Sequence, residues 1–406
     1  MERSYAKLTV TAKAERALRA GHPWVYGEEV TSQVGDYAPG DVVDVLSPKG
    51  RWLGAGLVND QSKIRVRLLS RNPNDRFNEA FFRRRVEYAL RYRKTVMGGD
   101  FSACRLIFGE ADQFPGLTVD RYEGILVTEV LSLGMERRKD LIYRLLAETM
   151  AAMGEPIRAI YERNDAPLRA KEGLPAAHGF YPLPGLAADL DGHVRIRENG
   201  LWFDVDYISG QKTGFFLDQK YNRQAAARLA AGKRVLDCFT HTGAFALNAA
   251  AAGAQRVTAV DVSAEALRQA AYNASLNGLA DRIDFQKADV FVLLTEAAKS
   301  SPDWDYIILD PPAFTKSSAT ADSAYRGYRE INRRAMQLLP RGGYLATCSC
   351  SHFMPAARFE QMLRDAAGDA QVSLRQIEAR QQAPDHPVLW GVPETDYLKF
   401  YLFQVV

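Results

Sequence analysis

The second half of the chain alternates short apolar runs with longer segments in which apolar residues recur every three or four positions. Each apolar run is bounded by turn residues, and the segment after it has the period of an amphipathic helix. Strands that alternate with helices in this way form doubly wound, mainly parallel α/β sheets. The strands that we predict are 234–237, 256–261, 283–289, 306–310 and 343–349.

The first part of the chain has a different pattern, with a period of two residues. Alternating runs at 41–46 and 64–69 lie between Pro-Gly, Pro-Lys-Gly and Asn-Asp turn signals, which predicts a small β-rich module, most simply a barrel, over 1–76. Because side chains alternate across a strand, we expect the second run to bury one face. The opposite face would then present the cations Lys63, Arg65 and Arg67.

Between these two regions, from about residue 78 to residue 185, a helical pattern is followed by a mixture of strand and helix patterns. From about residue 78 apolar positions recur at helical spacing with arginines among them, which predicts an amphipathic basic helix. Further strands and one helix predict a compact α+β domain, and a Pro/Gly-rich stretch at 181–185 marks a linker. Next, Asn199-Gly200 between two alternating runs predicts a hairpin. The domains that we expect are therefore 1–76, 77–185 and 186–406.

Charge is distributed unevenly along the 406 residues. The total net charge is only +3, but residues 62–105 contain twelve basic and four acidic side chains, a local net charge of +8. Local positive charge favours binding to polyanions, because each neutralised phosphate releases counterions. The simpler alternative is a solvated helix face. As RNA-binding candidates we take Arg83, Arg84 and Arg85.

Composition excludes several classes of protein. With 47% hydrophobic and 25% charged residues the chain is an ordinary globular protein, and no apolar run reaches the ~18 residues of a membrane span. We therefore expect no membrane association. The four cysteines form neither a disulfide framework nor a zinc pattern, so we expect reduced thiols, a cytoplasmic protein and no metal site. They are Cys104, Cys238, Cys348 and Cys350.

Four successive predicted strands end in an aspartate. In doubly wound sheets these ends meet at one crevice, where ligands bind. A single aspartate there is often only a helix cap, but four supply acceptors for ribose hydroxyls and for the adenine amine. The loop 237–243 lacks the three-glycine fingerprint for a pyrophosphate, which favours S-adenosylmethionine over NAD. The residues that we expect to bind this cofactor are Asp237, Phe239, Thr240, Gly243, Asp261, Asp289 and Asp310.

Two further segments at the predicted crevice indicate chemistry on a base. Asp310-Pro-Pro is a stiff loop that can hold the edge of a flat heterocycle, with Phe314 to stack on it and Lys316 to reach a phosphate. The cysteines at 348 and 350 follow the next strand. Carbon 5 of a pyrimidine becomes nucleophilic only after a nucleophile adds to carbon 6, and a thiolate is well suited to that reversible addition. The residues alone do not decide between the two cysteines.

At this point the sequence resembles the RlmI-type 23S rRNA (cytosine-5) methyltransferases over essentially the whole chain. The segments that carry the resemblance are 22–26 and the barrel after it, similar to a PUA RNA-binding module, 162–165, 210–219, 237–243, 310–316, 349–351, 385–387 and 397–399. The resemblance implies S-adenosylmethionine as cofactor, a Rossmann-like catalytic domain, and 23S rRNA or a large-subunit precursor as partner. A homodimer is an open alternative to a monomer.

The resemblance also assigns roles. It implies that Cys350 adds to carbon 6 of cytosine and that Asp310 holds or protonates the ring at N3. Gln219 and Lys212 lie in a family segment and would contact the cofactor or the RNA. Two departures affect these roles: Ala313 stands where many RNA cytosine-5 methyltransferases have a second cysteine, and a Thr-Cys-Ser triplet of those enzymes would instead indicate Cys348.

Two other functions compete with 5-methylcytidine formation. The same Asp-Pro-Pro loop could bind an exocyclic amine or ring nitrogen, so the enzyme would methylate a nitrogen of guanine or adenine and the cysteines would be incidental. A protein of a different class, a non-catalytic RNA-binding assembly factor, could retain the fold without activity. The complete set of strand-end carboxylates argues against this last alternative.

Overall fold

The computed structural model describes residues 4–300, 304–315 and 318–406, and the chain forms two compact units. The first unit contains residues 1–196, 205–217 and 384–395, and the second contains 197–204, 218–383 and 396–406. Two short segments of the C-terminal half thus belong to the first unit. In the part of the chain that the structure describes, no helix is long and apolar enough to cross a bilayer.

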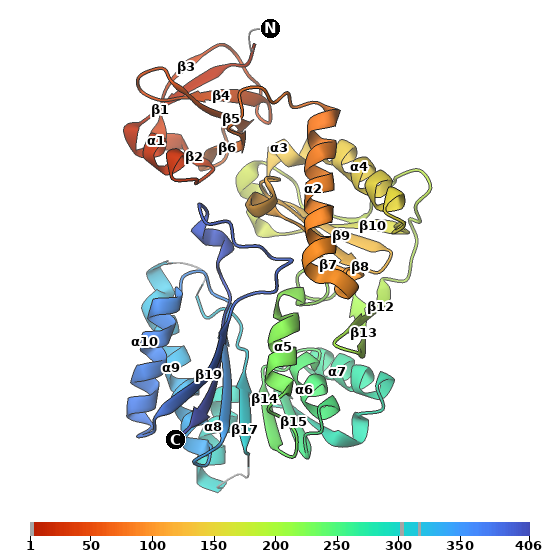
Figure 1. Ribbon diagram of the computed structural model, residues 1–406, viewed down its shortest axis with the longest axis vertical. Helices are drawn as coiled ribbons and strands as arrows, with labels where there is room; N and C mark the ends of the chain where they lie inside the picture. Colours follow the sequence, from red (N-terminus) through yellow and green to blue (C-terminus); the bar gives the residue numbers. More distant parts are fainter. Residues whose placement is uncertain (1–3, 301–303, 316–317) are drawn as a thin grey trace. The chain divides into compact units, whose positions relative to one another are not determined.

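The N-terminal part of the first unit is a six-stranded sheet with the order β2-β6-β5-β4-β1-β3 (Figure 1). Buried aliphatic side chains such as Leu8, Val43 and Val66 form its core, with helix α1 packed against it. The predicted alternation over 64–69 is therefore confirmed for the apolar face. The elements are β1 Lys7–Val10, α1 Ala12–Arg19, β2 Trp24–Tyr26, β3 Val30–Val34, β4 Val42–Leu46, β5 Trp52–Val58 and β6 Ile64–Ser70.

The expected cationic face of β6 is wrong for Arg67. Its side chain is buried and donates two hydrogen bonds to the carboxylate of Glu172, at 2.8 and 3.2 Å. The same carboxylate accepts hydrogen bonds from Asn59 and Ser62. Glu172 lies more than 100 residues away in the sequence, so the local pattern of β6 could not indicate this partner.

The rest of the first unit is built on a five-stranded sheet with the order β11-β10-β9-β8-β7. The long helix α2 packs against α4 and β7, and the side chain of Asn78 caps its first turn by accepting from the Phe81 N–H. The predicted α+β domain is thus present, although β7 and β11 were not predicted. The elements are α2 Glu79–Met97, β7 Ala103–Phe108, β8 Leu117–Tyr122, β9 Ile125–Val130, α3 Leu133–Glu136, α4 Lys139–Ala152, β10 Ala159–Asn164 and β11 Ala177–Phe180.

A segment near the C-terminus, residues 384–395, belongs to this unit rather than to the sheet around it in the sequence. The hydroxyl of Tyr92 and the guanidinium of Arg93 donate to the carbonyls of Pro384 and Asp385 at 2.9 Å. The Asp385 carboxylate accepts from the backbone N–H of Arg105 at 2.8 Å. The Asp-His-Pro motif at 385–387 therefore fastens this segment to α2 and β7.

The predicted hairpin is confirmed. Strands β12 (His193–Glu198) and β13 (Leu201–Asp206) pair across a two-residue turn, in which Asn199 and Gly200 have φ angles of 52° and 84°. These are the positive values that a type I′ turn requires.

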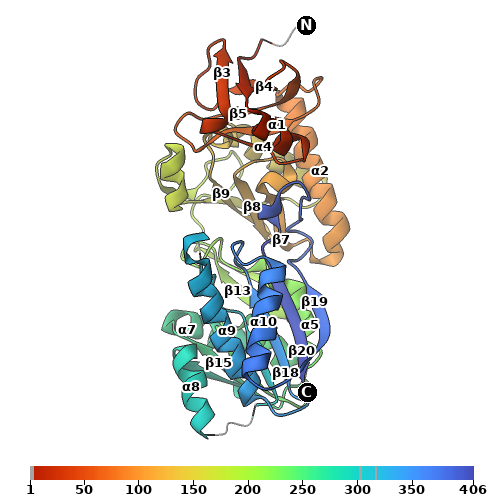
Figure 2. The same cartoon turned by 90° about the vertical axis from the view of Figure 1, so that its left-hand side faces the viewer.

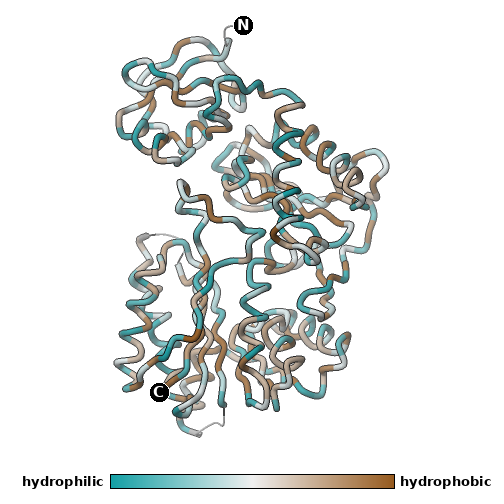
Figure 3. The backbone as a smooth tube through the Cα atoms, viewed as in Figure 1, coloured by the Kyte–Doolittle hydropathy of each residue, from teal (hydrophilic) through white to brown (hydrophobic). Residues whose placement is uncertain are grey.

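The second unit is built on a seven-stranded sheet with the order β16-β15-β14-β17-β18-β20-β19. Its strands are parallel except β20, which is antiparallel to both of its neighbours. Helices α5, α6 and α7 cover one face and α8, α9 and α10 the other (Figures 1 and 2). The doubly wound α/β prediction is confirmed, and Figure 3 shows apolar segments along the central strands. The elements are α5 Lys220–Ala227, β14 Arg234–Cys238, α6 Ala244–Ala251, β15 Arg256–Asp261, α7 Ala264–Leu276, β16 Ile283–Lys287, α8 Val290–Ser300, β17 Tyr306–Leu309, α9 Ala321–Leu338, β18 Tyr344–Ser349, α10 Ala356–Asp369, β19 Leu374–Arg380 and β20 Lys399–Val405.

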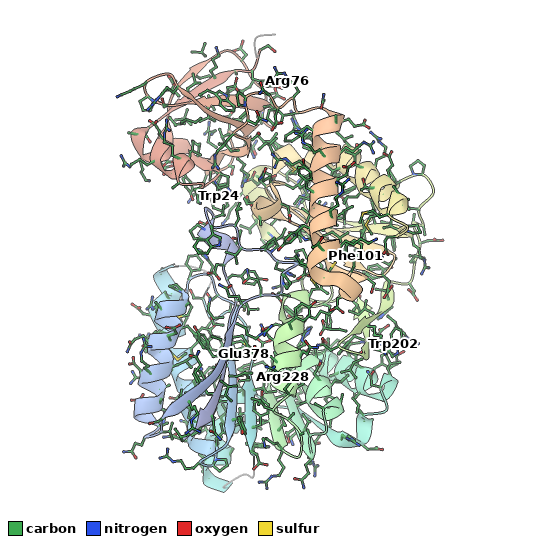
Figure 4. All side chains as sticks on the ribbon, in the orientation of Figure 1. Trp24, Arg76, Phe101, Trp202, Arg228 and Glu378 are labelled. Atoms are coloured by element: carbon green, nitrogen blue, oxygen red, sulfur yellow. The ribbon has the colours of Figure 1, made fainter. Side chains whose placement is uncertain are left out.

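Side-chain pairs hold the outer parts of this sheet to its helices. Arg228, which follows α5, forms an ion pair with Glu378 on the edge strand β19 (Figure 4). Arg380 on the same strand donates to the side chain of Asn222 in α5 at 3.1 Å. The first helix of the unit is therefore anchored to its edge strand, directly beside residue 219.

Candidate functional site

The candidate site lies where the strand order of the seven-stranded sheet reverses, between β14 and β17. These parallel strands are in register, with Cys238 opposite Leu309. Asp237 is the penultimate residue of β14, and Asp310 directly follows β17. The two carboxylates therefore meet at the edge where doubly wound sheets bind their ligands.

The loop between β14 and α6 is held in a strained conformation. Phe239 and His241 have φ angles of 64° and 50°, and Gly243 has 83°. The positive φ angle of Gly243 strains any residue with a Cβ atom, and such an atom would also lie 3.0 Å from the Cβ of Ala270. Strained non-glycine residues persist only where the surroundings enforce them, and they concentrate at binding sites.

Asp237 holds this loop with one oxygen. Its Oδ2 accepts hydrogen bonds from Thr240 Oγ1 at 2.6 Å and from the Ala246 N–H at 3.0 Å. The other oxygen, Oδ1, is buried with no hydrogen-bond partner among the described residues. A buried acceptor without a donor is costly, which fits an atom that receives a hydrogen bond from a bound ligand. Of the predicted cofactor residues, Asp237, Thr240 and Gly243 thus build one loop.

Asp261 ends β15 and lies beside the same loop. Its two carboxylate oxygens accept from the N–H groups of His241 and Ser263, each at 2.9 Å. Each oxygen has a second lone pair, and the residue is partly exposed, so it can also accept from ribose hydroxyls. These acceptors fit an adenosyl group.

Asp289 caps a helix, which is the common role of a single aspartate after a strand. Its Oδ1 accepts from the N–H groups of Phe291 and Val292, at 2.8 and 3.2 Å, and so caps helix α8. The side chain is exposed. Its predicted contact with adenine remains a prediction.

The electrostatics of the site favour neutral carboxyl groups. Burial, together with the negative charges of Asp310 and Asp261, raises the pKa of Asp237 to about 7. Burial also raises the pKa of Asp310 to about 6, although the nearby Arg223 lowers it. Two adjacent carboxyl groups that titrate near neutral pH are typical of sites that hold or move protons.

Gln219 and Cys348 both contact Asp310. The Gln219 Nε2 donates to Asp310 Oδ1 at 3.0 Å, and Asn222 donates to the Gln219 carbonyl oxygen at 2.7 Å. The Cys348 thiol interacts with the same carboxyl group and lowers its pKa. Cys348 is fully buried, and burial raises its pKa well above the usual thiol value. It is therefore placed to orient Asp310 rather than to react.

Cys350 lies just beyond the end of β18 and is partly exposed. Its Sγ is 4.0 Å from the carbonyl oxygen of Pro311, and the Ser351 hydroxyl donates to the Thr315 carbonyl at 3.1 Å. The turn that carries Cys350 is thus fastened to the Asp-Pro-Pro loop. Burial distinguishes the two cysteines that the residues alone could not separate.

The predicted stacking residue, Phe314, is packed on several sides. Its ring centroid lies 4.6 Å from that of Tyr328, 5.8 Å from Phe291 and 6.4 Å from Phe239. It remains partly exposed, so stacking on a base stays a prediction. Phe239 contributes to this aromatic cluster and is also partly exposed. Lys316 lies outside the described residues.

Four predicted RNA-binding cations, Arg83, Arg84, Arg85 and Lys212, lie in the first unit. Arg83 pairs with Glu79 and Glu148, and Arg84 with Asp75. Arg85 donates to the Leu69 carbonyl at 3.0 Å, and burial lowers its pKa. Lys212 is exposed, with its ammonium 4.7 Å from the centroid of the Phe216 ring.

The local charge of +8 is not a single cationic surface. Arg67, Arg93 and Arg105 are buried or nearly so, in ion pairs with Glu172, Asp112 and Asp120 respectively. Because these partners neutralise them inside the fold, these arginines cannot contact phosphates. At most nine of the twelve basic residues of 62–105 can therefore contribute to a cationic surface.

Sequence reasoning missed two buried cations near the site. Arg223 on α5 pairs with Glu198 at 2.7 Å and acts on the charge of Asp310. Lys399 begins β20 and donates to the Ser351 carbonyl at 2.6 Å. Lys399 has two sequence signals, its place in the family segment 397–399 and a single charge at the head of the apolar run Phe400-Tyr-Leu-Phe403, but neither indicates its burial or its partners.

Comparisons with known proteins agree with this geometry. A family model described as S-adenosylmethionine-dependent methyltransferase matches residues 186–404, and a PUA-like domain model matches residues 8–71. A putative S-adenosylmethionine-dependent methyltransferase from Streptococcus mutans superposes with a TM-score of 0.81, covering 98% of this chain and all of that one. It is 23% identical in sequence, so this likeness shows the fold.

The curated relatives are closer in sequence. The ribosomal RNA large subunit methyltransferase I of Shewanella amazonensis is 41% identical over 389 residues, 95% of this chain and 96% of that protein. The protein of the same name from Alteromonas mediterranea is 38% identical over 402 residues, 98% of this chain and 99% of that one. The chain therefore belongs to the ribosomal RNA large subunit methyltransferase I family of S-adenosylmethionine-dependent methyltransferases.

Proposed function

We propose that the protein methylates carbon 5 of a cytidine in 23S rRNA, or in a large-subunit precursor, through a thiolate adduct of Cys350. The observation that carries this proposal is the placement of Cys350. Its thiol is partly exposed at the end of β18, while Asp310 follows the neighbouring strand β17. A nucleophile and a carboxyl group that titrates near neutral pH thus share one edge of the sheet.

We assign the cofactor to the carboxylates of β14 and β15. The unpaired Oδ1 of Asp237 and the partly exposed Asp261 provide acceptors, and the loop with Phe239, Thr240 and Gly243 shapes the site. Asp289 and Gln219 complete the proposed set. When bound, S-adenosylmethionine supplies an electrophilic methyl group for carbon 5.

The protein's own groups would act in sequence. The Cys350 thiolate forms a bond to carbon 6, and the electron pair of the C5–C6 double bond moves toward carbon 5 and N3. Asp310, held by Gln219, protonates or hydrogen-bonds N3 and so stabilises this electron-rich ring. After methylation, carbon 5 loses its proton to water or another base. The double bond re-forms, the S–C6 bond breaks, the thiolate leaves, and a proton that N3 has taken up returns to Asp310.

RNA contacts are proposed for the first unit. A cavity of about 370 Å³ lies beside helix α2, and it combines two guanidinium groups with an exposed aromatic ring and two amides, groups that suit phosphates and bases. It is lined by Asn72, Asp75, Arg84, Arg85, Tyr88 and Gln113. Arg83 and Lys212 would add to this surface, and Phe314 and Lys316 would contact RNA in the second unit.

The proposed division of labour keeps three domains, 1–76, 77–185 and 186–406, of which the first two position RNA and the last transfers the methyl group. The six-, five- and seven-stranded sheets, one in each of these ranges, support this division. We keep the homodimer as an alternative to the monomer, and sedimentation velocity distinguishes the two.

The decisive experiment compares Cys350→Ala with Cys348→Ala in single-turnover methyl transfer to a 23S rRNA transcript. We expect Cys350→Ala to abolish 5-methylcytidine, mapped by bisulfite sequencing, and Cys348→Ala to retain it. RNA that contains 5-fluorocytidine should trap a covalent adduct with the wild type and with Cys348→Ala only. If Cys350→Ala still methylates the RNA, the adduct mechanism is wrong and methylation of a base nitrogen becomes the better explanation.

A further inference from the structure

Lys399 is a buried cation beside the turn that carries Cys350. It is the first residue of β20 and only 5% exposed. In the antiparallel pairing of β18 and β20 its partner is Ser349, the residue before Cys350. The side chain therefore lies against the end of β18, at the edge of the candidate site.

The hydrogen bonds of Lys399 account for only part of its ammonium group. Two N–H groups donate to the backbone carbonyls of Ser351 and Tyr397, at 2.6 and 2.7 Å. An ammonium has three donors, so one remains. Both acceptors are neutral carbonyl oxygens, so these hydrogen bonds do not neutralise the positive charge of the ammonium group. Within the described ranges, no carboxylate lies within 4.0 Å of the Lys399 Nζ.

Burying a charge without an opposite charge is unfavourable. Burial accordingly lowers the pKa of Lys399 to about 8, and the interactions that oppose this shift come first from Cys350 and then from Asp396. Electrostatic coupling between two groups is reciprocal. A thiolate at 350 that favours the protonated amine must therefore be favoured by that amine to the same extent.

Among the described residues near this turn, four titratable groups supply no positive charge, and His352 is exposed to solvent, which screens any charge that it carries. Cys348 on β18 and Tyr328 on α9 have pKa values raised by burial and are neutral at physiological pH. Asp310 and Asp396 carry negative charge when ionised, which disfavours a thiolate. Lys399 is thus the group in this set that can stabilise one.

We propose that Lys399 is a positioning residue that favours Cys350 as a thiolate, through the buried positive charge that it carries at the end of β18 and through its hydrogen bond to the carbonyl of Ser351. The use of that thiolate in methyl transfer rests on the proposed function, but the ionisation of Cys350 does not. The two ideas can therefore fail separately.

The test measures the ionisation of Cys350 in the full-length protein without RNA or cofactor. The rate of alkylation by iodoacetamide is followed from pH 5 to 10 by mass spectrometry of the peptide that contains Cys350. We expect Lys399→Met to move the inflection up by about one pH unit and to slow alkylation about tenfold at pH 7, since each pKa unit changes the thiolate fraction tenfold. Lys399→Arg, which keeps the charge, should recover most of the rate.

Lys299→Met is the matched control, because Lys299 is exposed at the end of α8 and pairs with Glu296. It should alkylate like the wild type. A Lys399→Met profile that superimposes on the wild type would overturn the proposal.

A second measurement covers the case in which Lys399→Met does not fold. In Cys350→Ala protein labelled with ¹³C-lysine, the NMR titration of Lys399 should shift to lower pH than in the wild type. An unchanged titration would also overturn the proposal.

Discussion

Replacing Asp310 with asparagine should make the second unit more stable while abolishing methyl transfer. Burial raises the pKa of this carboxyl group from 3.8 to about 6. Between these values the folded state binds more protons than the unfolded state, so the stability of the wild type falls as pH rises. Above pH 6 the full penalty of the buried charge remains, and the asparagine variant does not have it.

The magnitude follows from the size of the shift. A rise of about two pKa units corresponds to about 3 kcal/mol. Asp310 keeps partial exposure, and solvent screening reduces this to about 1.5 kcal/mol, or roughly a tenfold change in the unfolding equilibrium. Asparagine retains an oxygen that can accept from Gln219, and any loss of the Cys348 contact shifts the difference by the same amount at every pH.

Hydrogen exchange of the slowest amides in β14 and β17 measures this difference, because those amides exchange through unfolding of the unit. At pH 4 the ratio of the exchange rates of the variant and the wild type gives a baseline, because the Asp310 carboxyl group is then mostly protonated in the folded protein. At pH 8 the variant should exchange about tenfold more slowly, relative to the wild type, than this baseline ratio. A ratio that stays constant between pH 4 and 8 would refute the assignment of a buried, destabilising charge.

Asp305 provides a control at the other end of the same strand. It pairs with Arg234 at 3.0 Å, and this contact lowers its pKa. A carboxyl group with a lowered pKa contributes stability above its unfolded pKa and loses it as pH falls. Asp305→Asn should therefore reverse the sign of the pH dependence seen with Asp310→Asn.

Two further predictions concern the first unit. Arg67→Met leaves the buried carboxylate of Glu172 without its cation and should destabilise the six-stranded sheet by about 3–5 kcal/mol in urea unfolding. The double variant with Glu172→Leu should lose less stability. Equal losses would contradict the uncompensated charge as the cause. Arg84→Glu should weaken binding to a 23S rRNA transcript and reduce the slope of log K against log salt by about one. Arg268→Glu on α7, the control, should change neither quantity. If Arg84→Glu leaves binding unchanged, the cavity beside α2 does not contact RNA.

Local sequence patterns were sufficient to predict the sheet of the second unit and the row of carboxylates at its edge. Apolar runs, helical periods and turn residues are local signals, because neighbouring residues along the chain decide whether a strand forms and where it ends. Asp237, Asp261 and Asp310 could be placed at one edge for this reason, and the Asn199-Gly200 turn was predictable from two residues.

Which of these groups are accessible and which are paired depends on long-range contacts that the folded structure reveals. The two cysteines are two residues apart on one strand end, yet one is covered and the other partly exposed. Arg67 and Glu172 are separated by 105 residues, and Gln219 and Asp310 by 91. Burial and ion pairing depend on partners from distant segments, and a local sequence pattern does not predict which distant segment makes the contact. The same is true of Lys399, because only the pairing of β20 with β18 brings its side chain to the turn that carries Cys350.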